Sequence, residues 1–255
     1  MAGVVVRWTF VVLGAIGMVW ALCWRAWYQD RPAEGVPERT HSHAGVPWGE
    51  LLRQRQLWLI FAMYFCQAWG SWFYFGWFPS YLVKSGFTEG EMGIFSSLPF
   101  LLGAMGNVAG GYLSDRLPMR FGLKTGRRLV GAVSLGTSAL LLIAMSLTQD
   151  KTAIVVLSSL GFGVADLMLP AAWALCLDIG HRYAGVVTGT MNTAGQLGGF
   201  ICSVLFGYAV TAMGSYQSPL WIVAGMVMVA AILHAHRSDA AAAGGGSSEG
   251  GGFVT

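Results

Sequence analysis

One carboxylate lies in the middle of an otherwise apolar segment of this 255-residue chain. It is Asp166, within residues 161–170, and no Lys or Arg lies within one or two helical turns of it. A charged side chain at such a depth costs about 2.5–3.5 kcal/mol on insertion scales, so it usually faces a cavity or a partner. A carboxyl group that exchanges a proton there is what proton coupling requires. The alternatives are a protonated Asp166 that hydrogen-bonds a neighbouring helix, or one that faces water at a helix break near Pro170.

A second group of polar side chains follows one face of an earlier helix. Gln67, Ser71, Tyr74 and Phe78 recur at spacings of four, seven and eleven residues, which places them on one side. The polar ends of Gln67 and Tyr74 are suited to hydrogen-bond a carboxylated or hydroxylated substrate. Because aromatic residues surround them, the alternative is a helix whose aromatic side chains serve packing.

A stripe of small and polar residues marks a later helix at spacings of three and four: Gly185, Thr188, Gly189, Asn192, Gly195, Gln196 and Gly199. Small residues let helices approach closely in lipid, so packing explains the glycines. An amide in lipid needs hydrogen-bond partners, which leaves Asn192 and Gln196 as candidates for a polar cavity.

The run from Gly111 to Arg128 joins two apolar segments and carries five of the fifteen Lys and Arg residues. Asp115 can pair there with Arg116, Arg120 or Arg128, or face the positive N-terminus of a helix. Helix termination at Pro118 and the charge bias of a cytoplasmic loop explain the arginines. They do not explain Asp115 or Gly122.

The elements that position these residues are transmembrane helices. The chain is 55% hydrophobic and only 11% charged, whereas a soluble domain carries about a quarter charged residues. Apolar windows approach the roughly 20 residues that cross a bilayer, and their continuity favours helices over a barrel. We expect an all-α membrane protein with about seven transmembrane helices, at residues 5–26, 57–83, 92–114, 129–149, 152–177, 184–213 and 218–236.

The distribution of positive charge predicts the orientation. With the N-terminus outside and the C-terminus in the cytoplasm, twelve Lys and Arg residues face the cytoplasm and only Arg7, Lys84 and Lys151 face outward. This is a strong positive-inside bias. We therefore expect a multi-pass protein of the cell (inner) membrane.

Four regions follow from this reading. A transmembrane helix occupies residues 1–27, a polar cytoplasmic linker residues 28–56, and a six-helix bundle residues 57–237. The Ala-, Gly- and Ser-rich residues 238–255 are expected to be a disordered cytoplasmic tail.

The order Gly-x-Leu-x-Asp-Arg-x-x-x-Arg-x-Gly-x-Lys from Gly111 resembles the signature loop of the major facilitator superfamily of secondary transporters. The whole chain up to Arg237 looks like the carboxy-terminal half of such a transporter, with residues 1–27 equivalent to the sixth of twelve helices. Residues 77–82 and 192–199 are similar to the anion:cation symporter family, which moves organic anions such as sugar acids, usually with protons. Helices one to five have no counterpart here.

The resemblance implies roles for these residues. The seventh and tenth helices of the family line the central cavity, which places Asp166 near Tyr74, and Asn192 matches a substrate-contacting amide. The charges of the loop form a cytoplasmic gate, which implies this role for Gly111, Asp115, Arg116, Arg120, Gly122 and Arg128. The stripe of Gly103, Gly106, Asn107 and Gly110 is expected to pack mainly against the missing amino-terminal half.

The expected function is that of a partial secondary transporter for a small organic anion, coupled to H+ or Na+, whose partners are the lipid bilayer and the missing amino-terminal half. The alternative is a truncated, non-transporting membrane protein that acts as an assembly or interaction partner. An enzyme is not expected, because no Gly-x-Ser-x-Gly, phosphate loop, His-rich or paired-carboxylate cluster occurs. We expect no cofactor, no metal site and no nucleic-acid partner.

Overall fold

The computed structural model describes residues 2–28, 46–180 and 183–244. Helix α1 (Ala2–Trp27) belongs to one compact unit, and the chain from Val46 onward forms a second. The described residues of both units are helical and include no strand. Most of the linker expected at 28–56, and residues 245–255 of the expected tail, lie outside the described residues.

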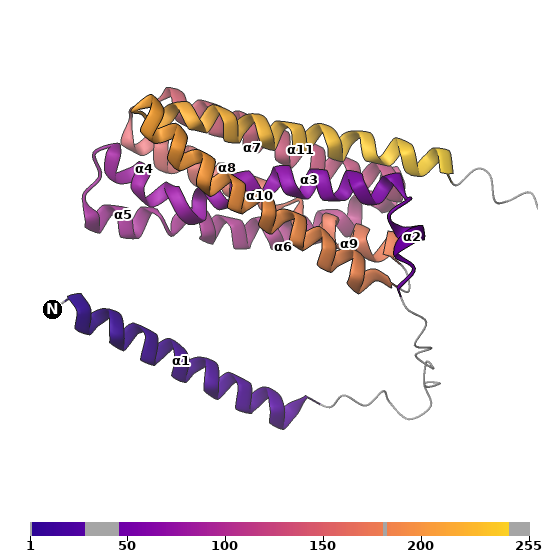
Figure 1. Ribbon diagram of the computed structural model, residues 1–255, viewed down its shortest axis with the longest axis horizontal. Helices are drawn as coiled ribbons and strands as arrows, with labels where there is room; N and C mark the ends of the chain where they lie inside the picture. Colours follow the sequence, from indigo (N-terminus) through magenta and orange to yellow (C-terminus); the bar gives the residue numbers. More distant parts are fainter. Residues whose placement is uncertain (1, 29–45, 181–182, 245–255) are drawn as a thin grey trace, which may run out of the picture. The chain divides into compact units, whose positions relative to one another are not determined.

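The second unit is a helical bundle whose long helices run back and forth along a common direction (Figure 1). It begins with a short helix α2 (Trp48–Leu51), followed by α3 (Arg55–Trp72), η1 (Phe73–Trp77) and α4 (Phe78–Lys84), which continue one another. The remaining helices are α5 (Glu89–Phe95), α6 (Leu98–Phe121), α7 (Leu123–Leu147), α8 (Lys151–Asp166), α9 (Leu169–Gly180), α10 (Ala184–Met213) and α11 (Gln217–Gly244).

Six of these helical segments, α1 among them, are long and apolar enough to cross a membrane, among the residues that the structure describes. The segment expected at 57–83 is not one of the six, although it is helical from Arg55 to Lys84. The change of helix type at Phe73 divides it, and Arg55, Gln56 and Gln67 lower the hydropathy of α3. The architecture is that of an all-α, multi-pass membrane protein, as the sequence predicts.

Proline residues stand next to interruptions in two helical segments that contribute to the site described below. Pro79 has no N–H to donate to Phe75, and its ring crowds that carbonyl; the helix widens here to the π-helical turn η1. Pro170 stands in the same relation to Asp166, and α8 ends at Asp166 before α9 starts at Leu169. The helix break expected near Pro170 is therefore present, and Asp166 occupies the last turn of α8.

The six-helix bundle is internally symmetric in its packing. The first triplet of segments is α3/α4, α5/α6 and α7, and the second is α8/α9, α10 and α11. The first segment of each triplet packs against the second and third segments of the other: α3 contacts α10 and α11, and α8 contacts α6 and α7. The third segments, α7 and α11, contact each other. In both triplets the first segment is interrupted next to a proline, Pro79 in one and Pro170 in the other. This is the pattern of a repeat, which the residues alone do not reveal.

The core consists of aromatic and aliphatic side chains from all six segments. Phe73, Phe78 and Tyr81 of the first segment are at most 1% exposed and pack against α7, α10 and α11. Ser158 and Ser159 of α8 are buried beside them. The helix ends differ most from the sequence prediction at three places: α6 continues through Pro118 to Phe121, α7 begins at Leu123, and α11 continues past Arg237 to Gly244. Gly122 separates α6 from α7 with a φ of 81°, a left-handed conformation that suits glycine.

Candidate functional site

A groove between α3/η1, the α8–α9 break and α10 brings most of the predicted cavity residues together. Its volume is about 190 Å³. Three segments contribute the lining: Tyr64, Gln67, Ala68, Ser71, Trp72 and Phe75 from the first, Phe162, Asp166 and Leu169 from the second, and Asn192, Gly195 and Gln196 from α10. Four of the five residues predicted for coupling or substrate contact thus lie at one site, although they are up to 129 positions apart in the sequence (196 − 67).

Asp166 is the one charged residue in the lining of the groove. It is half-buried at the C-terminal end of α8, and no Lys or Arg of the described part of the chain forms an ion pair with it. Its Oδ2 atom lies close to α6, where a Cβ atom added to Gly103 would meet it at 2.9 Å. The carboxyl group is therefore held between two helices and faces uncharged neighbours.

The amides are placed differently from one another. Gln67 is buried, and its Nε2 donates a hydrogen bond to Ser71 Oγ at 2.9 Å, which fixes the orientation of the carboxamide. Asn192 and Gln196 lie one turn apart on α10 and are exposed at the groove. Together they present donors and acceptors of the kind that a carboxylate or a hydroxyl group requires.

Tyr74 lies elsewhere than the sequence predicts. It is 2% exposed, and its hydroxyl donates a hydrogen bond to the Ser158 carbonyl at 3.0 Å, inside the bundle. Its ring packs on Phe162 with centroids 4.9 Å apart. Tyr74 joins α8 to the first segment and does not line the groove. Aromatic residues surround this helix, so the spacing of its polar residues did not identify the side that faces the groove.

Tyr64 is the groove residue that sequence reasoning missed. Its ring packs against Gly195, where an added Cβ would lie 2.6 Å from Cδ1, and its hydroxyl reaches the Trp173 side chain. Tyr64, Ala68, Ser71 and Phe75 follow the same spacing of four, seven and eleven that suggested the Gln67 set. The sequence therefore contains this spacing on two neighbouring faces of the helix, and the spacing alone does not decide which face lines the groove.

The glycine stripe on α6 packs within this chain, contrary to the prediction that it faces a missing half. A Cβ atom on Gly106 would collide with the Gly163 carbonyl, and one on Gly110 with the Leu167 carbonyl. Gly103 lies against the Phe162 ring, where an added Cβ would be 2.5 Å away. These contacts hold α6 against α8 at the level of Asp166.

The small-residue stripe on α10 has two parts. Gly195 and Gly199 pack closely against Tyr64 and Trp72 of α3, as the packing interpretation predicts. Gly198, which is not part of the predicted stripe, packs against the Phe65 backbone. A Cβ atom on Gly185 or Gly189 would meet nothing within 4 Å of the atoms that the structure describes. Among the glycines of this stripe, only those in the middle of α10, near Gln196, are closely packed.

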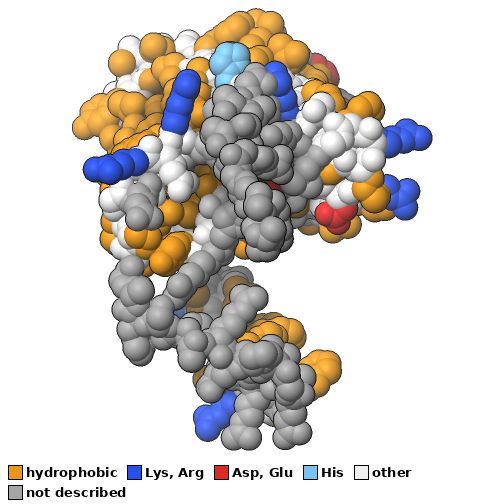
Figure 2. All heavy atoms as spheres, turned by 90° about the vertical axis from the view of Figure 1, so that its right-hand side faces the viewer, with side chains coloured by type: hydrophobic (Ala, Val, Ile, Leu, Met, Phe, Trp, Pro, Cys, Tyr) orange, Lys and Arg blue, Asp and Glu red, His pale blue; other side chains and the backbone are white. Residues whose placement is uncertain are grey.

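The Gly111–Arg128 loop lies at the end of the bundle opposite the α4–α5 turn, and Lys and Arg side chains project from that end (Figure 2). Asp115 and Arg120 are exposed, and the Arg116 guanidinium lies 4.4 Å from the centre of the Tyr112 ring. Gly111 has open space around it, and Gly126 contacts the backbone at Pro118. Within the described part of the chain Asp115 forms no ion pair, so the structure shows none of the pairings considered with Arg116, Arg120 or Arg128. The side chains of Lys124 and Arg127 lie outside what the structure describes.

Comparison with known proteins agrees with this geometry. Residues 1–203 match the model of the Major Facilitator Superfamily. The chain is 35% identical to a probable sulfoacetate transporter of Cupriavidus necator, covering 89% of this chain and 56% of the relative. It is 27% identical to a hexuronate transporter and 30% identical to a probable galactarate/D-glucarate transporter, both of Bacillus subtilis, with 88% of this chain and 56% and 54% of the relatives covered.

The chain thus spans about half the length of the curated relatives that it matches. The names of these relatives describe carriers of organic anions, in agreement with the resemblance to the anion:cation symporter family. The match to the family model covers 203 of the 255 residues, including α1, the groove segments and the signature loop. The chain therefore belongs to the Major Facilitator Superfamily.

Proposed function

We propose that this chain is the carboxy-terminal half of a secondary transporter for a small organic anion, such as a sugar acid or another carboxylate, driven by proton symport. The observation that carries the proposal is the groove in which Gln67, Asn192 and Gln196 surround the lone carboxyl group of Asp166. The names of the relatives, which are sulfoacetate, hexuronate and glucarate transporters, support the substrate class.

The composition of the groove supplies a physical reason for coupling. Its lining contains no Lys or Arg, so an ionised Asp166 would repel an incoming anion. Two unit charges of like sign at about 4 Å repel by about 4 kcal/mol at an effective dielectric constant of 20. Protonation of Asp166 removes this repulsion and turns the carboxyl group into a hydrogen-bond donor. The anion and the proton then bind together, as symport requires.

The rest of the transport machinery lies outside this groove. In the proposal an amino-terminal half completes the cavity wall and supplies any cationic contact to the anion. The chain lies in the cell (inner) membrane with its N-terminus outside and its C-terminus in the cytoplasm, so that the signature loop faces the cytoplasm and the cavity opens to each side in turn.

The test is an uptake screen of cells that express the chain together with its amino-terminal half. Sulfoacetate, D-glucuronate, D-glucarate and simple carboxylates are the candidate substrates, and neutral sugars are the control. We expect uptake of at least one anion to rise when the outside is acidified and to stop when a protonophore is added. Uptake of neutral sugars alone would contradict the proposal.

We further propose that Asp115 acts at a cytoplasmic gate, together with Gly111, Arg116, Arg120, Gly122 and Arg128. An exposed carboxylate without an ion-pair partner among the described residues is available to pair with the other half when that side closes. We expect Asp115→Ala to slow the maximal rate of uptake several-fold while the KM changes little. Glu89→Ala, which removes an exposed carboxylate at the opposite end, is the control. A raised KM with an unchanged maximal rate would remove the gating role.

A further inference from the structure

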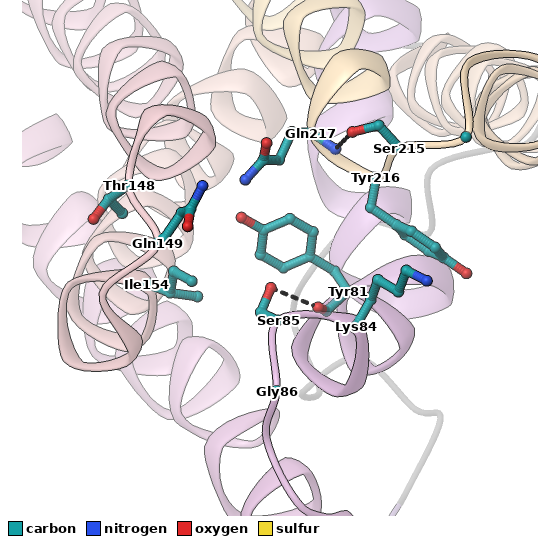
Figure 3. Close-up of a pocket in the computed structure, with 11 residues that line it drawn as sticks. Tyr81, Lys84, Ser85, Gly86, Thr148, Gln149, Ile154, Ser215, Tyr216 and Gln217 are labelled. Atoms are coloured by element: carbon teal, nitrogen blue, oxygen red, sulfur yellow. Dashed lines mark hydrogen bonds between the residues drawn. The ribbon is translucent and has the colours of Figure 1, made fainter.

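A larger pocket lies at the opposite end of the bundle from the signature loop. Its volume is about 420 Å³, within the usual range of about 300–1,000 Å³ for small-molecule sites. The end of α4, the turn before α8 and the turn before α11 enclose it, and it shares no lining residue with the groove around Asp166 (Figure 3). These are the three junctions that the charge distribution places outside the cell.

The walls of the pocket are fixed by local hydrogen bonds. Ser85 Oγ donates to the Tyr81 carbonyl at 2.8 Å, and the Gln217 backbone N–H donates to Ser215 Oγ at 3.1 Å. Beside the pocket, the Ala153 N–H donates to Asp150 Oδ2 at 2.7 Å and caps α8. Gly86 turns the chain with a φ of 88°. Each of the three turns is thus closed within itself, so the pocket is formed before any ligand arrives.

Several polar side chains line this pocket. Figure 3 shows the Tyr81 hydroxyl turned toward the carboxamides of Gln149 and Gln217, with Lys84 and Tyr216 on the other side. The Tyr81 hydroxyl donates a long hydrogen bond, 3.4 Å, to the Met145 carbonyl and also lies within reach of the Ser85 side chain. Within the described part of the chain, no residue pairs with the Lys84 ammonium or with either carboxamide. The lining includes one cation and no acid.

We propose that this pocket is a second binding site, for a small polyhydroxylated carboxylate. The carboxylate binds the Lys84 ammonium, and the hydroxyl groups exchange hydrogen bonds with Gln149, Gln217 and Tyr81. An exposed outer site of this kind concentrates the anion at the mouth of the carrier before it enters the cavity. That this anion is also the transported one rests on the proposed function, whereas binding at the pocket does not.

Equilibrium binding of radiolabelled D-glucuronate to the purified chain in neutral detergent tests the proposal. We expect Lys84→Ala to weaken binding about tenfold or more, because it removes the one cation of the lining and with it a charge-assisted hydrogen bond. Gln149→Ala combined with Gln217→Ala should weaken it several-fold. Lys151→Ala is the matched control, since Lys151 lies at the same end, 5.0 Å from the Phe87 ring centre, and does not line the pocket. D-glucose, which has the hydroxyl groups without the carboxylate, should not compete.

Asn192→Ala separates the two sites. If Asn192→Ala abolishes binding and Lys84→Ala leaves it unchanged, D-glucuronate occupies the groove, and the outer site is refuted while the proposed function stands. Equal losses of D-glucuronate binding in Lys84→Ala and Lys151→Ala would mean that general surface charge attracts the anion. This result would also refute the outer site. Failure of the unmodified chain to bind D-glucuronate would refute it outright. Thermal unfolding of each variant confirms that the bundle is intact.

Discussion

Replacing Asp166 with Asn is expected to abolish proton-driven accumulation of the anion, measured in vesicles that contain the chain together with its amino-terminal half. A gradient of one pH unit, acidic outside, supplies about 1.4 kcal/mol per proton, enough for a roughly tenfold accumulation of a co-transported anion. An amide in place of the carboxyl group cannot carry the proton, so the accumulation ratio should fall to about one. Exchange of labelled for unlabelled anion should persist, because the uncharged amide does not repel the substrate.

The pH dependence of binding gives the same test a second readout. In the unmodified protein, anion affinity should fall as the pH rises, because ionisation of Asp166 restores the repulsion. In Asp166→Asn this dependence should vanish. Asp150→Asn is the matched control, since Asn also caps helices and Asp150 lies in an exposed turn. Unchanged proton-driven uptake in Asp166→Asn would exclude Asp166 as the coupling residue.

The second large effect is expected from the α6–α8 contact, where Gly106→Ala should destabilise the bundle. The added methyl group would collide with the backbone carbonyl of Gly163, and backbone cannot move aside as a flexible side chain can. Overpacking of this kind costs about 1–3 kcal/mol. A lower apparent Tm in detergent and a smaller monodisperse fraction would report it.

Gly136→Ala is the control for this prediction. Gly136 lies in the middle of α7, and an added Cβ there would meet nothing within 4 Å. Alanine favours helix over glycine by about 0.8–1.0 kcal/mol, so this variant should be as stable as the original or more so. Equal Tm values for the two variants would mean that α6 and α8 are not held together at Gly106.

Part of the site was predictable from particular residues of the sequence. Asp166 stood out because a charge in an apolar segment has few explanations, and Pro170 marked the helix break beside it. Asn192 and Gln196 were singled out because amides in lipid need partners, and Gln67 because it shares a helix face with Tyr74 and can hydrogen-bond a substrate. The convergence of these residues depends on three segments far apart in the chain. Only the resemblance to a known family, and not the residues alone, suggested it.

The predictions that were wrong have physical causes as well. Tyr74 and Tyr64 both lie on plausible faces of one aromatic helix, and only the position of α8 decides which hydroxyl is buried. The α6 glycines predicted a close helix contact correctly but not its partner, since small residues fit any neighbouring helix. Pro118 did not end α6, because nothing local required the end there, and Gly122 with its positive φ did so instead.

The symmetry of the bundle connects these observations. Each triplet begins with a segment that is interrupted next to a proline, and in inverted-repeat transporters such broken helices form the binding site near the middle of the membrane. In the first triplet the interruption is η1, and α3 directly before it supplies Gln67 and Ser71 to the groove. In the second triplet the interruption lies between α8 and α9, and Asp166 is the last residue of α8. Both interrupted segments line the same groove.

Protection of an introduced cysteine tests most directly whether that groove is the transport cavity. In a Cys23→Ser background, which removes the exposed native thiol among the described cysteines, Asn192→Cys places a thiol in the groove and Thr193→Cys places one beside it on the exposed surface of α10. With the amino-terminal half present, the transported anion should slow alkylation of the cysteine at position 192 several-fold and leave that at 193 unchanged. Equal alkylation rates with and without the anion at both positions would contradict the account.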